Sequence, residues 1–449
     1  MKKTKRSTVL FHLAASVVTA AIGCVMIAAY SLARSAPASQ ELMQRGAYLA
    51  RAGDCIACHT TQGGKMFAGG LPLATPLGTI YSTNITPDLE TGIGRYEIDD
   101  FVRVMREGVA KDKHHLYPAM PYTSYARVSQ EDLLALYSYF MQGVEPVRQT
   151  NHPTKLNWPL SMRSLMAAWN ALYFKKGKYA ADPNKSTSWN RGAYLVQGLG
   201  HCGGCHTPRG IFGQEKAGSE QESRQYLTSA TLDNWHASPL TGDSETGLNA
   251  WSKDEIVEFL KTGRTARVAA LGVMAEVVGK STQYLTNQDL MAIAEYLKSL
   301  PPSNYEGQGN EDSARPRQPA AAAAATWALS IGNTGMRGSR IYLDNCNACH
   351  RSDGSGASRT FPNLVKNEAL NAKDPITLIH IVLAGGSMPS TQTAPTAFAM
   401  PDFGWRLSDA EVADVLSFVR GSWGNHVAAV SRDEVGHVRK TLANLKTAQ

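Results

Sequence analysis

The chain has 449 residues, of which 43% are hydrophobic and 8% aromatic, so it is long enough and apolar enough for more than one globular domain. The formal net charge is +7, but five Lys and Arg residues precede residue 39, where there is no acidic residue, which leaves only +2 for the rest. A charge this low excludes the basic surface of a nucleic-acid-binding protein, and we expect no nucleic-acid partner.

The first 38 residues have the pattern of an export signal. Basic residues at positions 2, 3, 5 and 6 precede an apolar stretch over residues 9–32, and small residues follow at 36–38. The stretch is long enough to span a bilayer, so residues 1–38 are predicted to be a signal peptide or an N-terminal anchor. A lipoprotein site at Cys24 is a weaker interpretation, because apolar residues follow where a polar tether is expected. Export predicts a place on the periplasmic side of the bacterial cytoplasmic membrane.

After this leader, one order of features occurs three times. A helix-forming segment with an Arg-Gly pair at 45–46, 191–192 and 337–338 precedes each of three cysteine pairs. A second predicted helix ends at a glycine in each repeat, over residues 96–108, 251–263 and 374–385. A third predicted helix opens with a capping box at Ser129, Thr286 and Ser408. Each repeat therefore reads as a small helical unit.

Six of the seven cysteines form Cys-X-X-Cys pairs, and a histidine follows every pair. They are Cys55/Cys58 with His59, Cys202/Cys205 with His206, and Cys346/Cys349 with His350. This is the attachment motif of c-type haem, in which the thiols bond the porphyrin vinyl groups and the imidazole binds the iron. One isolated pair could be half of a zinc site or a redox disulfide, but three complete copies in an exported chain favour three haem c groups.

A methionine between the second and third helices of each repeat is the candidate for the second axial ligand. Met120, Met274 and Met400 lie in predicted loops, 12, 11 and 15 residues after the glycine stops. Met388 is the fallback, because it lies only 3 residues after its glycine. Histidine–methionine ligation saturates the iron, which suits electron transfer and leaves no position for oxygen or peroxide.

These patterns predict an all-α fold with three tandem cytochrome c domains, joined by linkers and preceded by an export signal. The predicted segments are 1–38 for the signal peptide or anchor, 39–148, 186–303 and 331–424 for the domains, 149–185 and 304–330 for the linkers, and 425–449 for a C-terminal tail. The second linker is rich in Pro and Ala and is predicted to be flexible.

Three further features have more than one interpretation. The first linker contains an apolar, aromatic-rich stretch over residues 156–174, followed by Lys175 and Lys176. It either packs between the first two domains or lies in the lipid interface, where a quinone could reach a haem. Arg209 either pairs with a haem propionate or is an ordinary surface arginine. His380 falls in an apolar helix and is expected to be a core histidine.

Several longer strings resemble the cytochrome c subunits of bacterial membrane-bound, quinone-linked dehydrogenases, which act on alcohols, gluconate, aldehydes, sorbitol or fructose. These strings span 84–94 (Asn-Ile-Thr-Pro-Asp-Leu-Glu-Thr-Gly-Ile-Gly), 116–122 (Leu-Tyr-Pro-Ala-Met-Pro-Tyr), 191–209 around the second cysteine pair, and 422–425 (Ser-Trp-Gly-Asn). The resemblance covers essentially the whole chain after the leader.

The resemblance implies an electron-transfer subunit with no substrate-oxidising site of its own. A separate catalytic subunit, with pyrroloquinoline quinone, flavin or molybdenum, would supply electrons, and ubiquinone would receive them at the surface of the cytoplasmic membrane. The alternative is a free-standing multihaem carrier that delivers electrons to a terminal oxidase.

Overall fold

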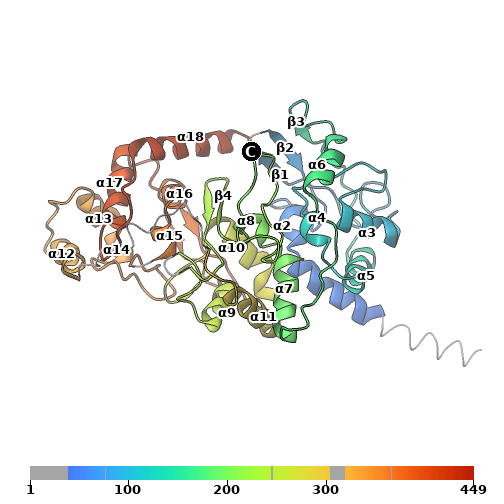
Figure 1. Ribbon diagram of the computed structural model, residues 1–449. Helices are drawn as coiled ribbons and strands as arrows, with labels where there is room; N and C mark the ends of the chain where they lie inside the picture. The colour runs from blue at the N-terminus through green and yellow to red at the C-terminus, as the bar shows by residue number, and fades with distance from the viewer. Residues whose placement is uncertain (1–38, 76, 244–245, 304–318, 366, 449) are drawn as a thin grey trace, which may run out of the picture.

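The computed structural model describes residues 39–75, 77–243, 246–303, 319–365 and 367–448. We call residues 39–148, 186–303 and 331–424 units 1, 2 and 3. The units follow one another along the molecule, with unit 2 in the middle (Figure 1). The predicted leader and most of the second linker lie outside the described residues. In the part of the chain that the structure describes, no helix is long and apolar enough to cross a membrane.

Unit 1 begins with a helix over residues 39–52. Its other helices are α2 (Cys55–His59), α3 (Ile98–Glu107), α4 (Tyr122–Tyr125) and α5 (Gln130–Ser138), which continues as a π turn, η1 (Tyr139–Gly143). Strands β1 (Pro72–Thr75) and β2 (Gly78–Tyr81) pair antiparallel, and β3 (Lys155–Leu156) from the first linker joins the edge of β2. The same linker carries α6 (Leu165–Tyr173).

Unit 2 has the same helix order with one addition. Its elements are α7 (Thr187–Gln197), α8 (Gly203–His206), the hairpin β4 (Ala230–Leu232) and β5 (Trp235–Ala237), α9 (Lys253–Thr262), α10 (Gly272–Lys280), the 3-10 turn η2 (Thr282–Tyr284) and α11 (Asn287–Lys298). The addition is α10, which occupies the segment predicted to be a loop.

Unit 3 closes the described part of the chain. Its elements are α12 (Pro319–Ser330) ahead of it, α13 (Ser339–Asn345), α14 (Asn347–His350), α15 (Glu368–Asn371), α16 (Ile376–Ala384), the hairpin β6 (Gly386–Ser387) and β7 (Ala399–Met400), α17 (Asp409–Arg420) and α18 (Arg432–Ala448). The helix α18 runs back from unit 3 along the top of the molecule (Figure 1).

The predicted glycine stops are confirmed. Helices α3, α9 and α16 end at Gly108, Gly263 and Gly385, whose φ angles are 62°, 74° and 72°. A residue with a side chain is strained at such an angle, so glycine ends the helix at low cost. The N-caps of α5, α11 and α17 are also those predicted, but only Ser408 and Glu411 form a reciprocal capping box among these three.

A second set of glycines brings two helices of each unit into backbone contact. A Cβ atom on Gly46, Gly192 or Gly338 would overlap the carbonyl oxygen of Ala135, Ala292 or Asp414, respectively. In each unit the helix before the cysteine pair therefore crosses the last helix (α5, α11 or α17) at a distance that only glycine permits. This crossing fixes the helix that leads into each haem-attachment motif.

The structure differs from the predicted, mainly helical fold in three places. The fold is not purely helical, because seven short strands form three antiparallel sheets within the described residues. The alanine tract assigned to a flexible linker forms α12, since alanine has the highest helix propensity. The presumed tail contains α18, whose Val435 and Val438 are buried against α16 and α17, and whose start is capped by Ser431 with Glu434.

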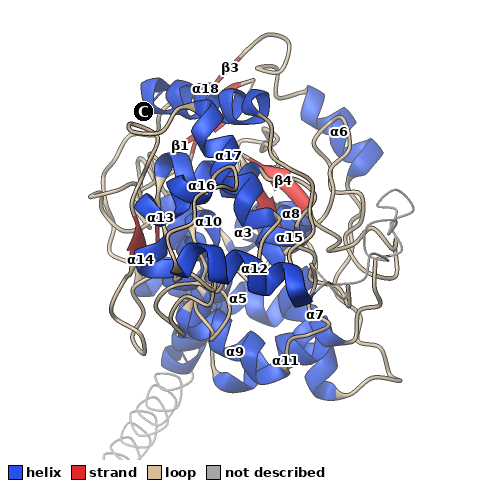
Figure 2. Ribbon diagram, turned by 90° about the vertical axis from the view of Figure 1, so that its left-hand side faces the viewer, coloured by secondary structure: helices blue, strands red, loops and turns tan. Residues whose placement is uncertain are grey.

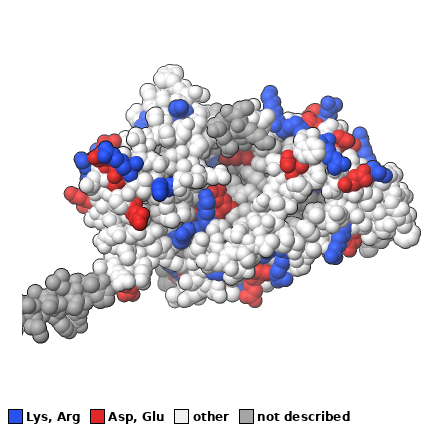
Figure 3. All heavy atoms as spheres, turned by 180° about the vertical axis from the view of Figure 1, so that it is seen from behind, with Lys and Arg blue, Asp and Glu red and all other residues white. Residues whose placement is uncertain are grey.

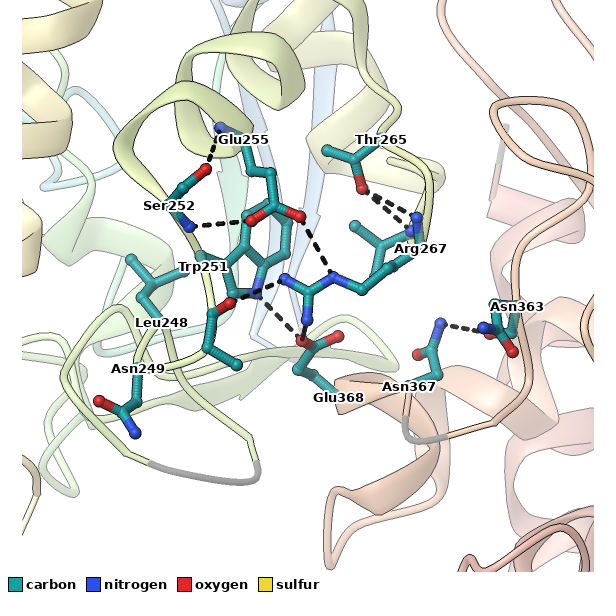
Figure 4. A network of polar contacts seen from close by, with 12 residues as sticks. Leu248, Asn249, Trp251, Ser252, Glu255, Thr265, Arg267, Asn363, Asn367 and Glu368 are labelled. Carbon is teal, nitrogen blue, oxygen red and sulfur yellow. Dashed lines mark hydrogen bonds and ion pairs between the residues drawn. The ribbon is translucent and has the colours of Figure 1, made fainter.

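Units 1 and 2 share one hydrophobic core, whereas unit 3 has separate apolar clusters. The contact between units 2 and 3 is more polar. In this contact, Arg267 lies between Glu255 of α9, at 3.4 Å, and Glu368 at the start of α15, at 3.8 Å (Figure 4). The indole nitrogen of Trp251 donates to the same Glu368 carboxylate at 3.0 Å. Arg359 of unit 3 also pairs with Glu258 of unit 2.

The first linker forms a projection at the edge of the molecule, with α6 on the outside (Figures 1 and 2). No residue of α6 is buried, which disfavours the first of the two interpretations of this stretch, core packing between units 1 and 2, although Phe174 contacts Tyr122 of unit 1 and Tyr173 contacts Phe212 of unit 2. Five apolar side chains, which we call the α6 surface, are exposed: Trp158, Leu160, Met162, Leu165 and Leu172. Over residues 156–174 the only charged residue is Arg163. On the face seen from behind, by contrast, Lys, Arg, Asp and Glu side chains lie close to one another in small mixed groups (Figure 3).

Candidate haem sites

Each cysteine pair lies at a short helical turn. This turn follows the helix that contacts the last helix of its unit through Gly46, Gly192 or Gly338. The turns are α2, α8 and α14, and the thiols are unpaired with one another. Two intervening residues place both sulfur atoms within one turn, as attachment to one porphyrin edge requires. Burial raises the pKa of Cys55, Cys202 and Cys346 to about 12 and that of Cys58 to about 11. Thiols in such apolar surroundings make poor redox nucleophiles and fit the edge of an apolar macrocycle.

The second cysteines of the pairs in units 2 and 3 are alike in backbone structure but not in exposure. The backbone N–H of Cys205 donates to the carbonyl oxygen of Cys202, and that of Cys349 donates to the carbonyl oxygen of Cys346, both at 3.2 Å. Cys205 is exposed, whereas Cys349 is half-buried. The three pairs therefore differ in their surroundings, although the motif is the same in all three. The bond of Cys349 to a haem stays a prediction from the motif, as do those of the other five cysteines.

The three histidines share one orientation. The Nδ1 atoms of His59, His206 and His350 lie 2.6, 2.7 and 3.0 Å from the backbone carbonyl oxygens of Thr83, Ser238 and Pro362. A proton on Nδ1 satisfies such a carbonyl, which leaves Nε2 with a free lone pair for a metal. Burial lowers the pKa of all three imidazoles, which favours the neutral, ligating form. The residues present therefore fit a covalently attached haem.

The candidate methionines lie in three different local structures. Met120 is half-buried in the turn before α4 and packs against the core shared by units 1 and 2. Met274 lies in the first turn of α10, so the predicted loop there is wrong; Leu271 provides no side-chain cap that would reveal the helix in the sequence. Met400 is on β7, opposite Gly386, and is half-buried, while Met388 is only 6% exposed.

Arg209 is exposed, and of the two expectations for Arg209 and His380 only the core position predicted for His380 is wrong. The guanidinium of Arg209 donates to the carbonyl oxygens of Gly204 and Gly213, both at 2.6 Å, so it clamps the loop of the second motif. His380 is not in a core: its ring lies 4.2 Å from that of Trp235, in the contact between units 2 and 3.

Other residues of the sites carry no signal in the sequence. The carbonyl partners of the histidines act through their backbone, which any residue type offers. Tyr125 donates to the carbonyl oxygen of Gly53 at 2.8 Å, and its ring lies 5.7 Å from that of His201. It thus joins the residues just before the first two cysteine pairs. Tyr48 and Tyr194 occupy the same position in two repeats, but this repetition alone indicates no role for them.

Comparison with known proteins supports the same type of site. Residues 335–423 match the cytochrome c family. The chain is 50% identical over 410 residues to the gluconate 2-dehydrogenase cytochrome c subunit of Pantoea cypripedii, covering 90% of each chain. It is 44% identical over 438 residues to the alcohol dehydrogenase (quinone) cytochrome c subunit of Gluconobacter oxydans, covering 96% of this chain and 88% of that one. Identity to the fructose dehydrogenase cytochrome subunit of Gluconobacter japonicus is 36% over 416 residues, covering 90% and 84%.

The fold and the attachment motifs define a c-type cytochrome, a protein that transfers electrons through covalently bound haem. Within this class, the chain belongs to the cytochrome c subunits of membrane-bound dehydrogenases, as the resemblance in the sequence predicted.

Proposed function

We propose that this chain carries three covalent haem c groups and passes electrons from a catalytic dehydrogenase subunit to ubiquinone, on the periplasmic side of the cytoplasmic membrane. The observation that carries the proposal is one arrangement present three times. In each unit a cysteine pair on a helical turn is followed by a histidine whose Nδ1 faces a backbone carbonyl. When bound, haem supplies reversible one-electron exchange.

The three units correspond in this proposal to three tandem cytochrome c domains with the boundaries predicted from the sequence. The thioether bonds to haem are those of Cys55 and Cys58, Cys202 and Cys205, and Cys346 and Cys349. Met120, Met274 and Met400 are the second axial ligands. Each lies in the same unit as one attachment motif, between the second and last helices of that unit. A methionine sulfur is a soft, neutral ligand that raises the potential of haem iron, as a respiratory electron carrier needs.

The relatives supply the reason for the proposed partners. Their names describe subunits of gluconate, alcohol and fructose dehydrogenases, and one of them is qualified as a quinone enzyme. By analogy, a catalytic subunit with pyrroloquinoline quinone, flavin or molybdenum oxidises the substrate and reduces this chain. Ubiquinone is the electron acceptor.

The α6 surface supports contact with the membrane surface. Trp158 is 80% exposed and Leu172 is 74% exposed, and Lys175 and Lys176 follow directly. Exposed tryptophan and leucine next to lysine is the composition of segments that lie in the lipid interface. A free-standing carrier between soluble proteins has no need of such a surface, which favours the quinone-linked subunit over the alternative.

The test uses the full chain, purified with its catalytic subunit in lipid nanodiscs. Haem content is measured first, and three covalent haems per chain are expected. The haems are then reduced with dithionite, the excess is removed, and reoxidation by ubiquinone-1 is followed. Trp158→Ala with Leu172→Ala is expected to slow reoxidation severalfold without loss of haem. Trp405→Ala, which removes a tryptophan that is 78% exposed in unit 3, is the matched control and is expected to have no effect.

Two results would contradict the proposal. A chain with fewer than three covalent haems would remove the threefold arrangement as its basis. A wild-type chain that ubiquinone-1 does not reoxidise, but that a terminal oxidase does, would establish the free carrier instead.

A further inference from the structure

Two tyrosines connect units 1 and 2 in a reciprocal way. The hydroxyl of Tyr48 in unit 1 donates to Oδ2 of Asp289 in unit 2 at 2.6 Å. The hydroxyl of Tyr194 in unit 2 donates to Oδ2 of Asp132 in unit 1, also at 2.6 Å. Both tyrosines end an Arg-Gly-Ala-Tyr string, and both aspartates occupy the third position of the last helix of their unit. The two contacts are therefore equivalent, because each unit supplies one tyrosine and one aspartate to the pair.

Each tyrosine also completes the helix cap of the other unit. The backbone N–H of Ser129 donates to the Tyr194 hydroxyl at 3.1 Å, and that of Thr286 donates to the Tyr48 hydroxyl at 3.3 Å. In an ordinary capping box, the carboxylate at the third position accepts this bond. Here the tyrosine of the neighbouring unit accepts it, which explains why these two helices lack the reciprocal box predicted for them.

The carboxylates are held from both sides. Arg45 donates to Asp132 within unit 1, and Arg191 donates to Asp289 within unit 2, each through Nε at 2.8 Å. Asp132 is 2% exposed and Asp289 is 7% exposed. A buried carboxylate that accepts one charge-assisted hydrogen bond from an arginine and one short hydrogen bond from a tyrosine has little freedom to move. Each tyrosine thus bonds to a fixed point in the opposite unit.

Unit 3 lacks this device, although its glycine crossing is the same. The position of the tyrosines is taken by Arg340, which is exposed and pairs with Asp344 on its own helix. The third position of α17 is Glu411, which accepts from the backbone N–H of Ser408 at 2.8 Å in an ordinary capping box. The reciprocal contacts are therefore particular to units 1 and 2.

The contacts act close to the first two haem sites. Tyr48 and Tyr194 lie 7 and 8 residues before the first cysteines of their motifs, on the helices that lead into α2 and α8. The helix α10, which bears Met274 of unit 2, packs against α2 of unit 1. A shift of one unit against the other would therefore move the attachment turn α2 of unit 1 relative to the helix α10 of unit 2.

We propose that Tyr48 and Tyr194 are positioning residues that hold the haem sites of units 1 and 2 in one relative arrangement, and so set the rate of electron exchange between them. The inference rests on the proposed function, in that units 1 and 2 each bind a haem. Electron tunnelling falls steeply with distance, so even a small displacement or rotation of the two units changes the exchange rate.

The experiment uses the full haem-loaded chain and the variants Tyr48→Phe, Tyr194→Phe and both together. Two neighbouring haems give a two-signed couplet in Soret circular dichroism, whose amplitude depends on their distance and mutual orientation. The double variant is expected to lose at least half of this amplitude and to show at least twofold slower exchange between the first two haems after flash reduction. The matched control is Tyr137→Phe, which removes a 2.9 Å bond to the carbonyl oxygen of Tyr96 inside unit 1.

A merely structural role would lower stability in the variants and the control alike and leave the couplet unchanged. That result, or a wild-type chain with both haems but no couplet, overturns the inference. Each single variant removes one of the two contacts, so the test holds even if the double variant does not fold. If the wild-type chain lacks a haem in unit 1 or unit 2, the proposed function itself has failed, and haem content reports this separately.

Discussion

At the scale of single residues, unit 3 poses a choice between two methionines. Met388 is buried, and its backbone N–H donates to the carbonyl oxygen of Phe398 at 2.9 Å. Met400 is half-buried on the opposite strand of the same hairpin. Because a buried methionine most often fills a core, we propose that Met388 packs in the core and that Met400 is the iron ligand.

This assignment predicts different results for two matched substitutions. Met400→Leu is expected to abolish the absorption band of one iron–sulfur bond and to lower one haem potential by on the order of 100 mV, because a neutral soft ligand is lost. Met388→Leu keeps volume and apolarity, so it is expected to keep all bands and to cost less than about 1.5 kcal/mol of stability. Visible spectra and a redox titration of the purified chain measure both; the reverse result would move the ligand to Met388.

The sequence could predict residues whose chemistry is in the side chain. The cysteines and the histidines are recognisable because haem attachment needs those groups at that spacing. The role of the carbonyl groups of Thr83, Ser238 and Pro362 could not be predicted, since every residue has a backbone carbonyl. The role of Tyr48 was also out of reach, because its partner Asp289 is 241 residues away in the chain and is found only in the folded structure.

At the scale of elements, the glycine crossings are the feature that positions the turns with the cysteine pairs. In unit 2, α7 and α11 meet at Gly192, where a Cβ atom would overlap the carbonyl oxygen of Ala292. Neither backbone can yield without moving a whole helix. The helix α7 leads to the second cysteine pair, so this crossing links helix packing to the position of Cys202 and Cys205.

We therefore expect Gly192→Ala to destabilise the protein by about 1–3 kcal/mol or more, as overpacking in a rigid core does. The matched control is Gly177→Ala, where a Cβ atom would have no neighbour within 4 Å. The control is expected to change the midpoint of urea unfolding, followed by far-ultraviolet circular dichroism, very little. Equal effects of both substitutions would show that α7 and α11 are not in backbone contact.

Helix ends were predictable where a local signal marks them, as at the glycine stops and the N-caps. Three elements lacked such a signal. The helix α10 starts without a side-chain cap. The helix α12 lies in an alanine-rich tract, whose simple composition was interpreted as a linker. The strand β3 forms by pairing with the edge of β2, which is far from it in the chain. Strands of two to four residues are set by tertiary pairing and not by local propensity.

At the scale of the whole molecule, the units differ in how they are joined. Units 1 and 2 share a core and the reciprocal tyrosine contacts, whereas unit 3 meets unit 2 through ion pairs and buried polar groups. The strength of ion pairs depends on the protonation of their groups and on the salt concentration. The junction between units 2 and 3 is thus the place where solution conditions are expected to affect the assembly.

Glu368 is the group at this junction whose protonation matters. Its side chain is 12% exposed, and within the described residues its Oε2 atom has no hydrogen-bond partner. Burial raises the pKa of Glu368, and Glu255 raises it further, against the lowering effects of Arg267 and of the bond from Trp251 (Figure 4). The folded state therefore holds this proton more tightly than the unfolded state does. Its contribution to stability is complete below the ordinary carboxyl pKa and is lost as the pH rises through the raised value.

Glu368→Gln keeps an acceptor for Trp251 and removes the buried charge. We expect the variant to melt at a higher temperature than the wild type at pH 7 to 8, and the difference to disappear near the ordinary carboxyl pKa, about 4.5, where the wild-type group is neutral as well. Glu258→Gln, which breaks the ion pair to Arg359 across the same contact, is the control with the opposite sign and should lose up to about 1 kcal/mol at pH 7. Calorimetry from pH 4.5 to 8 compares the three proteins. If Glu368→Gln instead loses as much unfolding free energy as Glu258→Gln at pH 7, Glu368 acts as an ionised partner of Arg267, and its charge stabilises the junction.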